Sequence, residues 1–205
     1  MDLHRLRELA DAANRADEEA TSVQLLRQAL ALRRRRPTVP HQVPPPAAGF
    51  WPTRELGVLG ALRAGQTKDP LVAMLARPPG AGKTALAVRW GHQSAGHYPD
   101  GQLFANLDRP AGGITRALGG FLRTLGVPAA ELPPGTGARA TRFAELIRVA
   151  RVLVVLDHVR DAHEVRALLP AGVDCAALIT SRSPLTALVA KEAVAWLEVT
   201  PVDLS

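Results

Sequence analysis

The sequence predicts an α/β fold in which helices cover both faces of a parallel β-sheet. From residue 50 onward, short apolar runs of the length of buried strands alternate with segments of helical periodicity. A glycine-rich turn joins the first of these runs to the helix after it, and a later run ends in a carboxylate. The 205 residues, 47% of them hydrophobic, suffice for one such domain with a smaller appendage.

The alternation predicts five strands and the helices that connect them. A short helix at residues 54–63 comes first. The expected strands are residues 71–76, 102–107, 152–156, 176–180 and 193–199. The expected helices after them are residues 83–94, 114–125, 139–150, 161–169 and 184–189, with a loop over residues 128–137. Because helical segments separate each strand from the next, the strands should run parallel.

Two amphipathic helices are expected before this domain, where leucines recur at helical spacing and Asn14 to Asp17 form the turn. They predict an αα-hairpin over residues 1–34. Residues 35–48 contain five prolines and are expected to form an extended linker. The α/β domain then occupies residues 49–205.

The net charge of +6 comes almost entirely from arginine, and four arginines follow one another at residues 33–36. This run ends the second predicted helix, where the helix dipole favours cations, and we interpret it as a solvated patch. Contact with nucleic-acid or lipid phosphates is the alternative. Only 4% of residues are aromatic, and no basic stripe interleaved with aromatic residues indicates nucleic-acid recognition.

Cys175 is the single cysteine, which excludes an internal disulfide and fits a reducing cytosol. It begins an apolar run, so we expect a buried, inert thiol rather than a nucleophile. The first residues lack a signal-peptide core, and no apolar run has the length of a membrane span. The expected location is therefore the cytoplasm, without a membrane partner.

The turn between the first strand and its helix has the sequence of a phosphate-binding loop. In such a loop, backbone N–H groups surround a phosphate chain, a lysine neutralises it, and a hydroxyl holds Mg²⁺. The flanking strand and helix place the phosphate at the positive end of a helix dipole. The candidate nucleotide-binding residues here are Pro79, Gly80, Ala81, Gly82, Lys83, Thr84 and Ala85.

One position departs from the full motif, which has a glycine five residues before Gly82. That position is Arg77. The arginine could add positive charge near the phosphates or distort the entrance of the loop, and the sequence leaves both interpretations open.

A second signal is the apolar strand that ends at Asp157, 74 residues after Lys83. A carboxylate at the end of a strand beside the loop can reach Mg²⁺, so Thr84 and Asp157 are the candidate magnesium ligands. His158 follows, where many ATPases of this architecture have a second acid. The histidine could act as a base, and a polar residue that starts a loop is the alternative. Asp157 and His158 are the candidate catalytic residues, but no clear general base is present. We therefore expect slow hydrolysis, at most that of a weak ATPase.

A third signal is Thr180-Ser181-Arg182 at the end of the fourth strand, the edge at which α/β sheets bind ligands. Arg182 is a candidate sensor of the terminal phosphate through a bidentate contact. A surface arginine in the turn before Pro184 is the alternative.

Together these motifs resemble the NB-ARC nucleotide-binding domain of STAND-type P-loop NTPases, in the version of bacterial SARP-type transcriptional regulators. The resemblance covers about residues 70–205. It rests on the loop, on Tyr98-Pro99-Asp100-Gly101-Gln102-Leu103, on residues 121–128 and 152–157, on Leu168-Leu169-Pro170 and on Ile179-Thr180-Ser181-Arg182. It implies a three-layer domain with a five-stranded parallel sheet that binds ADP or ATP with Mg²⁺.

The predicted hairpin resembles the first helices of the TPR-like bacterial transcriptional activation domain of those regulators. Other parts of the pattern are missing. Residues 50–55 match the segment before the first strand only in part, and the helical lids and the DNA-binding winged helix are absent. The sequence therefore resembles a shortened or internally deleted relative.

The function expected from these observations is that of a regulatory domain, of the transcription-regulator type, that binds ADP or ATP. Two alternatives stay open: an active small ATPase or kinase, and a non-catalytic adaptor that acts through the hairpin and the arginine run. A protein bound by the hairpin and a second copy of the chain are candidate partners. Sequence-specific DNA binding by this chain alone is not expected.

Overall fold

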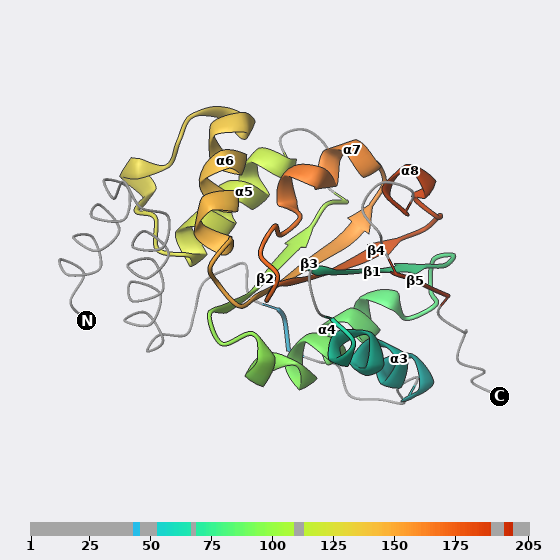
Figure 1. The fold of residues 1–205 in the computed structure, drawn as a ribbon. Coiled ribbons are helices and arrows are strands. Elements are labelled where there is room, and N and C mark those ends of the chain that lie inside the picture. Colours follow the sequence, from blue (N-terminus) through green and yellow to red (C-terminus); the bar gives the residue numbers. More distant parts are fainter. Residues whose placement is uncertain (1–42, 46–52, 67–68, 109–112, 190–194, 199–205) are drawn as a thin grey trace.

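The computed structural model describes residues 43–45, 53–66, 69–108, 113–189 and 195–198, drawn in colour in Figure 1. The predicted hairpin and residues 35–42 and 46–48 of the predicted linker lie outside this part. Among the described helices, none is long and apolar enough to cross a bilayer.

The core of the fold is a sheet in which every strand pair is parallel, as the sequence predicts. Its strands, in the order β2-β3-β4-β1-β5, are β1 Leu71–Ala76, β2 Gly101–Asn106, β3 Val152–Val159, β4 Ala176–Ser181 and β5 Ala195–Glu198. β3 and β4 thus lie between the consecutive strands β1 and β2. Because all the strands point the same way, their carboxyl ends form one edge of the sheet and their amino ends the other.

Helices cover both faces of the sheet (Figure 1). One face carries α3 Thr53–Ala64 and α4 Lys83–Gln93, and the other carries α5 Gly113–Thr124, α6 Gly135–Ile147 and α7 Ala162–Val165. The short helix α8 Thr186–Val189 precedes β5, and single 3-10 turns occupy Ala95–His97, Ala129–Glu131 and Arg166–Leu168.

Alternate side chains of each central strand enter two separate hydrophobic clusters. In β1, Val72 and Met74 lie in the cluster under α5 and α6, whereas Leu71, Ala73 and Leu75 lie in the cluster under α4. Burial on both faces explains why the strands are continuous apolar runs rather than alternating ones.

Several boundaries differ from the sequence prediction. The helix α6 begins at Gly135, inside the predicted loop, because Pro134 in extended conformation can precede a helix start. The predicted helix at 161–169 is split into α7 and a 3-10 turn. β3 runs three residues further than expected, to Val159.

The core side of α4 includes Leu86, Ala87, Val88 and Trp90. Ala85 is half-buried and His92 is exposed.

Part of the predicted linker packs on α4. Residues 43–45 form neither helix nor strand, yet Val43 is buried in the cluster under α4. A Cβ at Gly91 would lie 3.3 Å from Val43 Cγ1, and His92 Nε2 lies 2.7 Å from the carbonyl oxygen of Pro44. This short piece is therefore fixed to the domain.

Gly172 is a position where we expect a large effect on stability. A Cβ there would lie 2.6 Å from the backbone oxygen of Ile147 and 3.0 Å from that of Arg148. Backbone atoms cannot rotate away, so Gly172→Ala should lower the free energy of unfolding by about 1–3 kcal/mol in urea titrations. The control is Gly137→Ala in α6, where a Cβ meets nothing within 4 Å. The Gly137→Ala variant should raise the free energy of unfolding by about 0.5–1 kcal/mol, because alanine favours a helix more than glycine does. Equal effects of the two variants would refute the steric argument.

Cys175 is buried, as expected. Its thiol is fully buried and donates to the carbonyl oxygens of Ala150, at 3.1 Å, and Ile147, at 3.4 Å. Burial raises the pKa of the Cys175 thiol to about 11.

This shift predicts a loss of stability at alkaline pH. The unfolded chain releases the thiol proton at lower pH than the folded protein, so stability falls as pH rises through 9 toward 11. Between pH 8 and 10.5, the wild type should lose about 2 kcal/mol more of its unfolding free energy than Cys175→Ala. Parallel pH profiles of the two proteins, measured by denaturant unfolding, would count against this.

Candidate functional site

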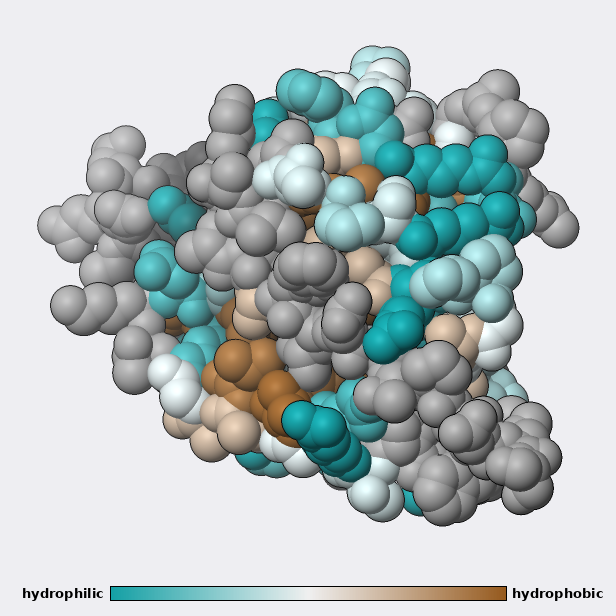
Figure 2. Space-filling model, turned by 90° about the vertical axis from the view of Figure 1, so that its right-hand side faces the viewer, coloured by the Kyte–Doolittle hydropathy of each residue, from teal (hydrophilic) through white to brown (hydrophobic). Residues whose placement is uncertain are grey.

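The residues singled out in the sequence meet at the carboxyl edge of the sheet. β4 lies between β3 and β1, so the loop after β1, Asp157 in β3 and Arg182 after β4 come from three adjacent strands. Figure 2 looks onto this side of the molecule and shows hydrophilic residues gathered over one part of it and a smaller hydrophobic patch over another. In open α/β sheets, ligands bind outside this edge.

The glycine-rich loop has the backbone conformation that its sequence requires. Gly80 and Gly82 have φ angles of 84° and 74°, in the left-handed region that favours glycine. Gly82 caps the N-terminus of α4, and its carbonyl oxygen accepts from Leu86 N at 2.9 Å. Pro79 is exposed, whereas Ala81 and Ala85 are half-buried. The first amides of α4 therefore follow directly from the loop, as in an anion site.

Lys83 folds back over the start of this loop. Its Nζ donates to the carbonyl oxygens of Arg77, at 2.7 Å, and Pro78, at 2.8 Å, and the residue is buried. Burial lowers the pKa of the Lys83 ammonium, the negative charge of Asp157 opposes this shift, and Arg182 adds to it. The ammonium has three donors, so one remains for a further acceptor.

Arg77 does not disrupt the loop. Its N–H donates to Ser181 O at 3.3 Å, which continues the pairing of β1 with β4 by one residue. Its carbonyl oxygen is one of the two acceptors for Lys83. The Arg77 Nε is buried and has no hydrogen-bond partner within the described residues. The Arg77 backbone thus extends the pairing of β1 and binds Lys83. The glycine turn begins only after this residue, so the missing glycine does not prevent the turn.

Asp157 is the centre of the hydrogen-bond network at this edge. It is only 1% exposed, and its Oδ1 accepts from Thr84 Oγ1 at 2.8 Å and from Thr180 Oγ1 at 2.6 Å. Asn106 Nδ2 approaches Oδ2 at 3.5 Å. Neither Thr180 nor Asn106 was predicted from the sequence to contact Asp157. Both are polar residues at the ends of apolar strands, which is the signal that could have indicated them.

His158 lies in an irregular part of β3. Its φ is 60°, unusual for a residue other than glycine, and the register with β4 shifts between Leu156 and Val159. Its N–H donates to Thr180 Oγ1 at 3.0 Å, and its Nδ1 lies 2.9 Å from Asp157 Oδ2 without the alignment of a hydrogen bond. The bulge therefore turns the imidazole toward the carboxylate.

Arg182 is exposed at the end of β4. Its positive charge contributes to the lowered pKa of Lys83, which places it within electrostatic range of the loop. It also acts on Asp108, whose pKa is lowered mainly by a hydrogen bond from Arg160. Within the described residues, Arg182 itself makes no ion pair.

The donor set at this edge fits an anion together with a hard cation. Loop amides and Lys83 are donors for an anion, and the oxygens of Thr84 and Asp157 are of the kind that Mg²⁺ prefers. Among the described residues, no group of three or more His, Cys, Asp or Glu side chains could hold a metal. A magnesium ion here would therefore need further oxygen ligands from phosphate or water, which is its usual mode with nucleotides.

No family model matches this chain. The chain is 44% identical over 115 residues to the regulatory protein AfsR of Streptomyces coelicolor and 41% identical over 117 residues to AfsR of Streptomyces griseus. Each match covers 54% of this chain and 12% of the relative, so the matched region spans about an eighth of those proteins. The crystal structure of Cdc6p from Pyrobaculum aerophilum aligns with a TM-score of 0.49 and 17% identity, over 80% of this chain and 48% of that one.

Proposed function

We propose that residues 49–205 form a regulatory nucleotide-binding domain that holds ADP or ATP with Mg²⁺ and turns ATP over slowly or not at all. The observation that carries this proposal is the 2.8 Å hydrogen bond from Thr84 Oγ1 to Asp157 Oδ1, directly after the left-handed glycine loop. This hydrogen bond joins a hydroxyl of α4 to a carboxylate of β3. A Mg²⁺ ion bound to nucleotide phosphates needs these two groups close together.

The roles follow from the chemistry of each residue. The backbone N–H groups of residues 80–85 bind the phosphates at the N-terminus of α4, where Pro79, which has no N–H, begins the turn. Lys83 supplies its remaining N–H donor and its charge. Thr84 and Asp157 hold Mg²⁺, which when bound neutralises phosphate charge, and Arg182 reaches the terminal phosphate by its guanidinium.

Slow turnover follows from what occupies the position after Asp157. A histidine stands there, and the bulge in β3 holds its Nδ1 2.9 Å from Asp157 Oδ2. This ring nitrogen thus faces the carboxylate that would hold the cation, without forming a hydrogen bond to it. The residue directly after Asp157 is therefore not the second acid that would orient a water.

The regulatory part of the proposal is supported by the two AfsR relatives, which are regulatory proteins and match about half of this chain. The motifs favour the NB-ARC class of STAND nucleotide switches and a role in transcription regulation in the cytoplasm. The hairpin predicted at residues 1–34, joined by the linker at 35–48, is the part proposed to contact a protein partner.

Nucleotide retention and turnover test this proposal together. Folded protein mixed with ATP and Mg²⁺ is separated from free nucleotide, and bound nucleotide and released phosphate are measured. We expect close to one nucleotide per chain and phosphate release near that of a Lys83→Ala control. Absence of bound nucleotide would refute the binding function, and release far above the control would favour an active ATPase.

A further inference from the structure

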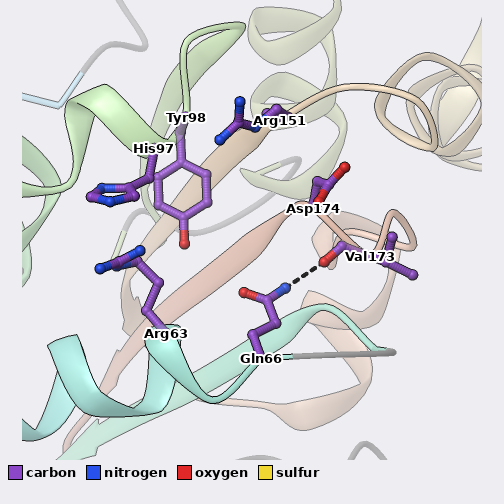
Figure 3. Close-up of a pocket in the computed structure, with 7 residues that line it drawn as sticks. All are labelled: Arg63, Gln66, His97, Tyr98, Arg151, Val173 and Asp174. Carbon is purple, nitrogen blue, oxygen red and sulfur yellow. Dashed lines mark hydrogen bonds between the residues drawn. The ribbon is translucent and has the colours of Figure 1, made fainter.

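A second polar pocket lies at the opposite edge of the sheet from the phosphate loop. It has a volume of about 180 Å³, and its lining includes Arg63, Gln66, His97, Tyr98, Arg151 and Asp174 (Figure 3). These residues precede β1, β2, β3 and β4, so they lie at the amino edge of the sheet. The glycine-rich loop follows β1 and lies at the carboxyl edge. Six residues of β1 separate the two edges, a distance of about 20 Å at about 3.3 Å per residue.

The Tyr98 hydroxyl is the unusual group in this pocket. Tyr98 is only 4% exposed, and its hydroxyl is buried without a hydrogen-bond partner within the described residues. Figure 3 shows the hydroxyl pointing into the space between Arg63 and Gln66. Burial raises the pKa of the Tyr98 phenol to about 12, so it is a protonated donor at neutral pH. A buried donor without an acceptor costs about 1–3 kcal/mol, which an acceptor from outside would remove.

Two guanidinium groups supply positive charge to the same space. Arg63 comes from the last turn of α3 and Arg151 from the residue before β3, and the charges of both act on the Tyr98 phenol. The Arg151 backbone N–H is fixed by Asp100 Oδ2 at 2.9 Å. In the described part of the molecule, neither guanidinium forms an ion pair, and Asp174 is the one carboxylate in the lining. The charged groups of the lining therefore carry a net positive charge.

Gln66 fixes the floor of the pocket. Its Nε2 donates to the carbonyl oxygens of Val173, at 2.5 Å, and Cys175, at 2.9 Å. These bonds orient the amide and hold α3 to the segment before β4. The pocket is therefore built by a fixed amide and a buried ring, and the ring of Trp90 lies 6.4 Å from that of Tyr98.

We propose that this pocket binds a phosphate group, either inorganic phosphate or that of a small phosphomonoester, between Arg63, Arg151 and the Tyr98 hydroxyl. Guanidinium groups bind such oxyanions in bidentate fashion, and the phenol adds a third donor. The volume lies below the about 300 Å³ of typical sites for larger ligands, so it matches a phosphate group better than a whole nucleotide. The site is separate from the loop of Lys83 and does not depend on the function proposed for it.

The test uses the full chain carrying Lys83→Ala, so that phosphate binding at the loop is weakened. Inorganic phosphate, and glycerol phosphate in a second series, are titrated at constant ionic strength while the Nε–H signals of Arg63 and Arg151 are followed by NMR. We expect a saturable shift of both signals. Arg63→Gln should weaken the response at Arg151 about tenfold, because it removes a charged group that can donate twice to phosphate. Tyr98→Phe should weaken it about threefold, because it removes one neutral donor.

Two variants keep the result interpretable. Tyr98→Phe removes only an unpartnered hydroxyl, so its fold should be retained. Arg116→Gln, which removes an exposed arginine of α5, should leave the affinity unchanged. A response that is absent or unsaturable with both inorganic phosphate and glycerol phosphate would overturn the proposal. A response that is the same in Arg63→Gln and Tyr98→Phe as in the parent protein would also overturn it. Saturation with glycerol phosphate but not with inorganic phosphate would identify a phosphomonoester as the ligand.

Discussion

Replacing Lys83 by alanine is expected to lower the affinity for ADP about 10- to 150-fold. The lysine is buried at the start of α4, bonded to the carbonyl oxygens of Arg77 and Pro78, with one donor left for phosphate. A hydrogen bond between charged groups contributes about 1.5–3 kcal/mol, which corresponds to that change in affinity. Calorimetric titration of both proteins with ADP in the presence of Mg²⁺ measures it.

The fold should survive this substitution, because Pro78 is exposed and water can replace the ammonium at its carbonyl oxygen. Arg116→Ala is the matched control, since it removes an exposed cation from α5 on a different face. If both variants weaken ADP binding equally, general charge rather than the loop is responsible, and the assignment of the site is wrong.

Replacing Asp157 by asparagine is expected to remove the magnesium dependence of nucleotide binding. The amide oxygen can still accept from Thr84 and Thr180, which now donate to Oδ1 at 2.8 and 2.6 Å, so the local structure should persist. The lost charge is the one that attracts the cation. We expect Mg²⁺ to increase ADP affinity at least about tenfold in the wild type and less than about threefold in Asp157→Asn.

Asp108→Asn is the control for this experiment. Asp108 follows β2 near the same edge of the sheet, but it pairs with Arg160 and is exposed. Its variant should keep the full magnesium effect. An Asp157→Asn protein with the magnesium effect of the wild type would show that the cation is held elsewhere.

The parts of the fold that the sequence predicted are those set by local pattern. Continuous apolar runs gave the strands because both faces of the sheet are covered, and the glycines of the loop gave its left-handed turns. The spacing of motifs also placed Thr84, Asp157 and Arg182 at one edge, since carboxyl ends of parallel strands coincide.

What the sequence did not predict depends on contacts between distant segments. The bulge at His158 arises from the register between β3 and β4, which no local pattern specifies. Thr180 and Asn106 reach Asp157 only because β4 and β2 are the neighbours of β3. The pocket at Tyr98 likewise requires α3 and the starts of several strands to meet. Strand order decides these contacts, and it is a property of the whole domain.

The most direct test of the central claim is a calorimetric titration of ADP into the folded wild-type protein, with Mg²⁺ and again with the cation chelated. The arrangement of the glycine loop, Lys83, Thr84 and Asp157 predicts one saturable site per chain, bound more tightly when Mg²⁺ is present. A sample that unfolds cooperatively yet gives no saturable ADP binding in Mg²⁺ would contradict the assignment of this edge as a nucleotide site.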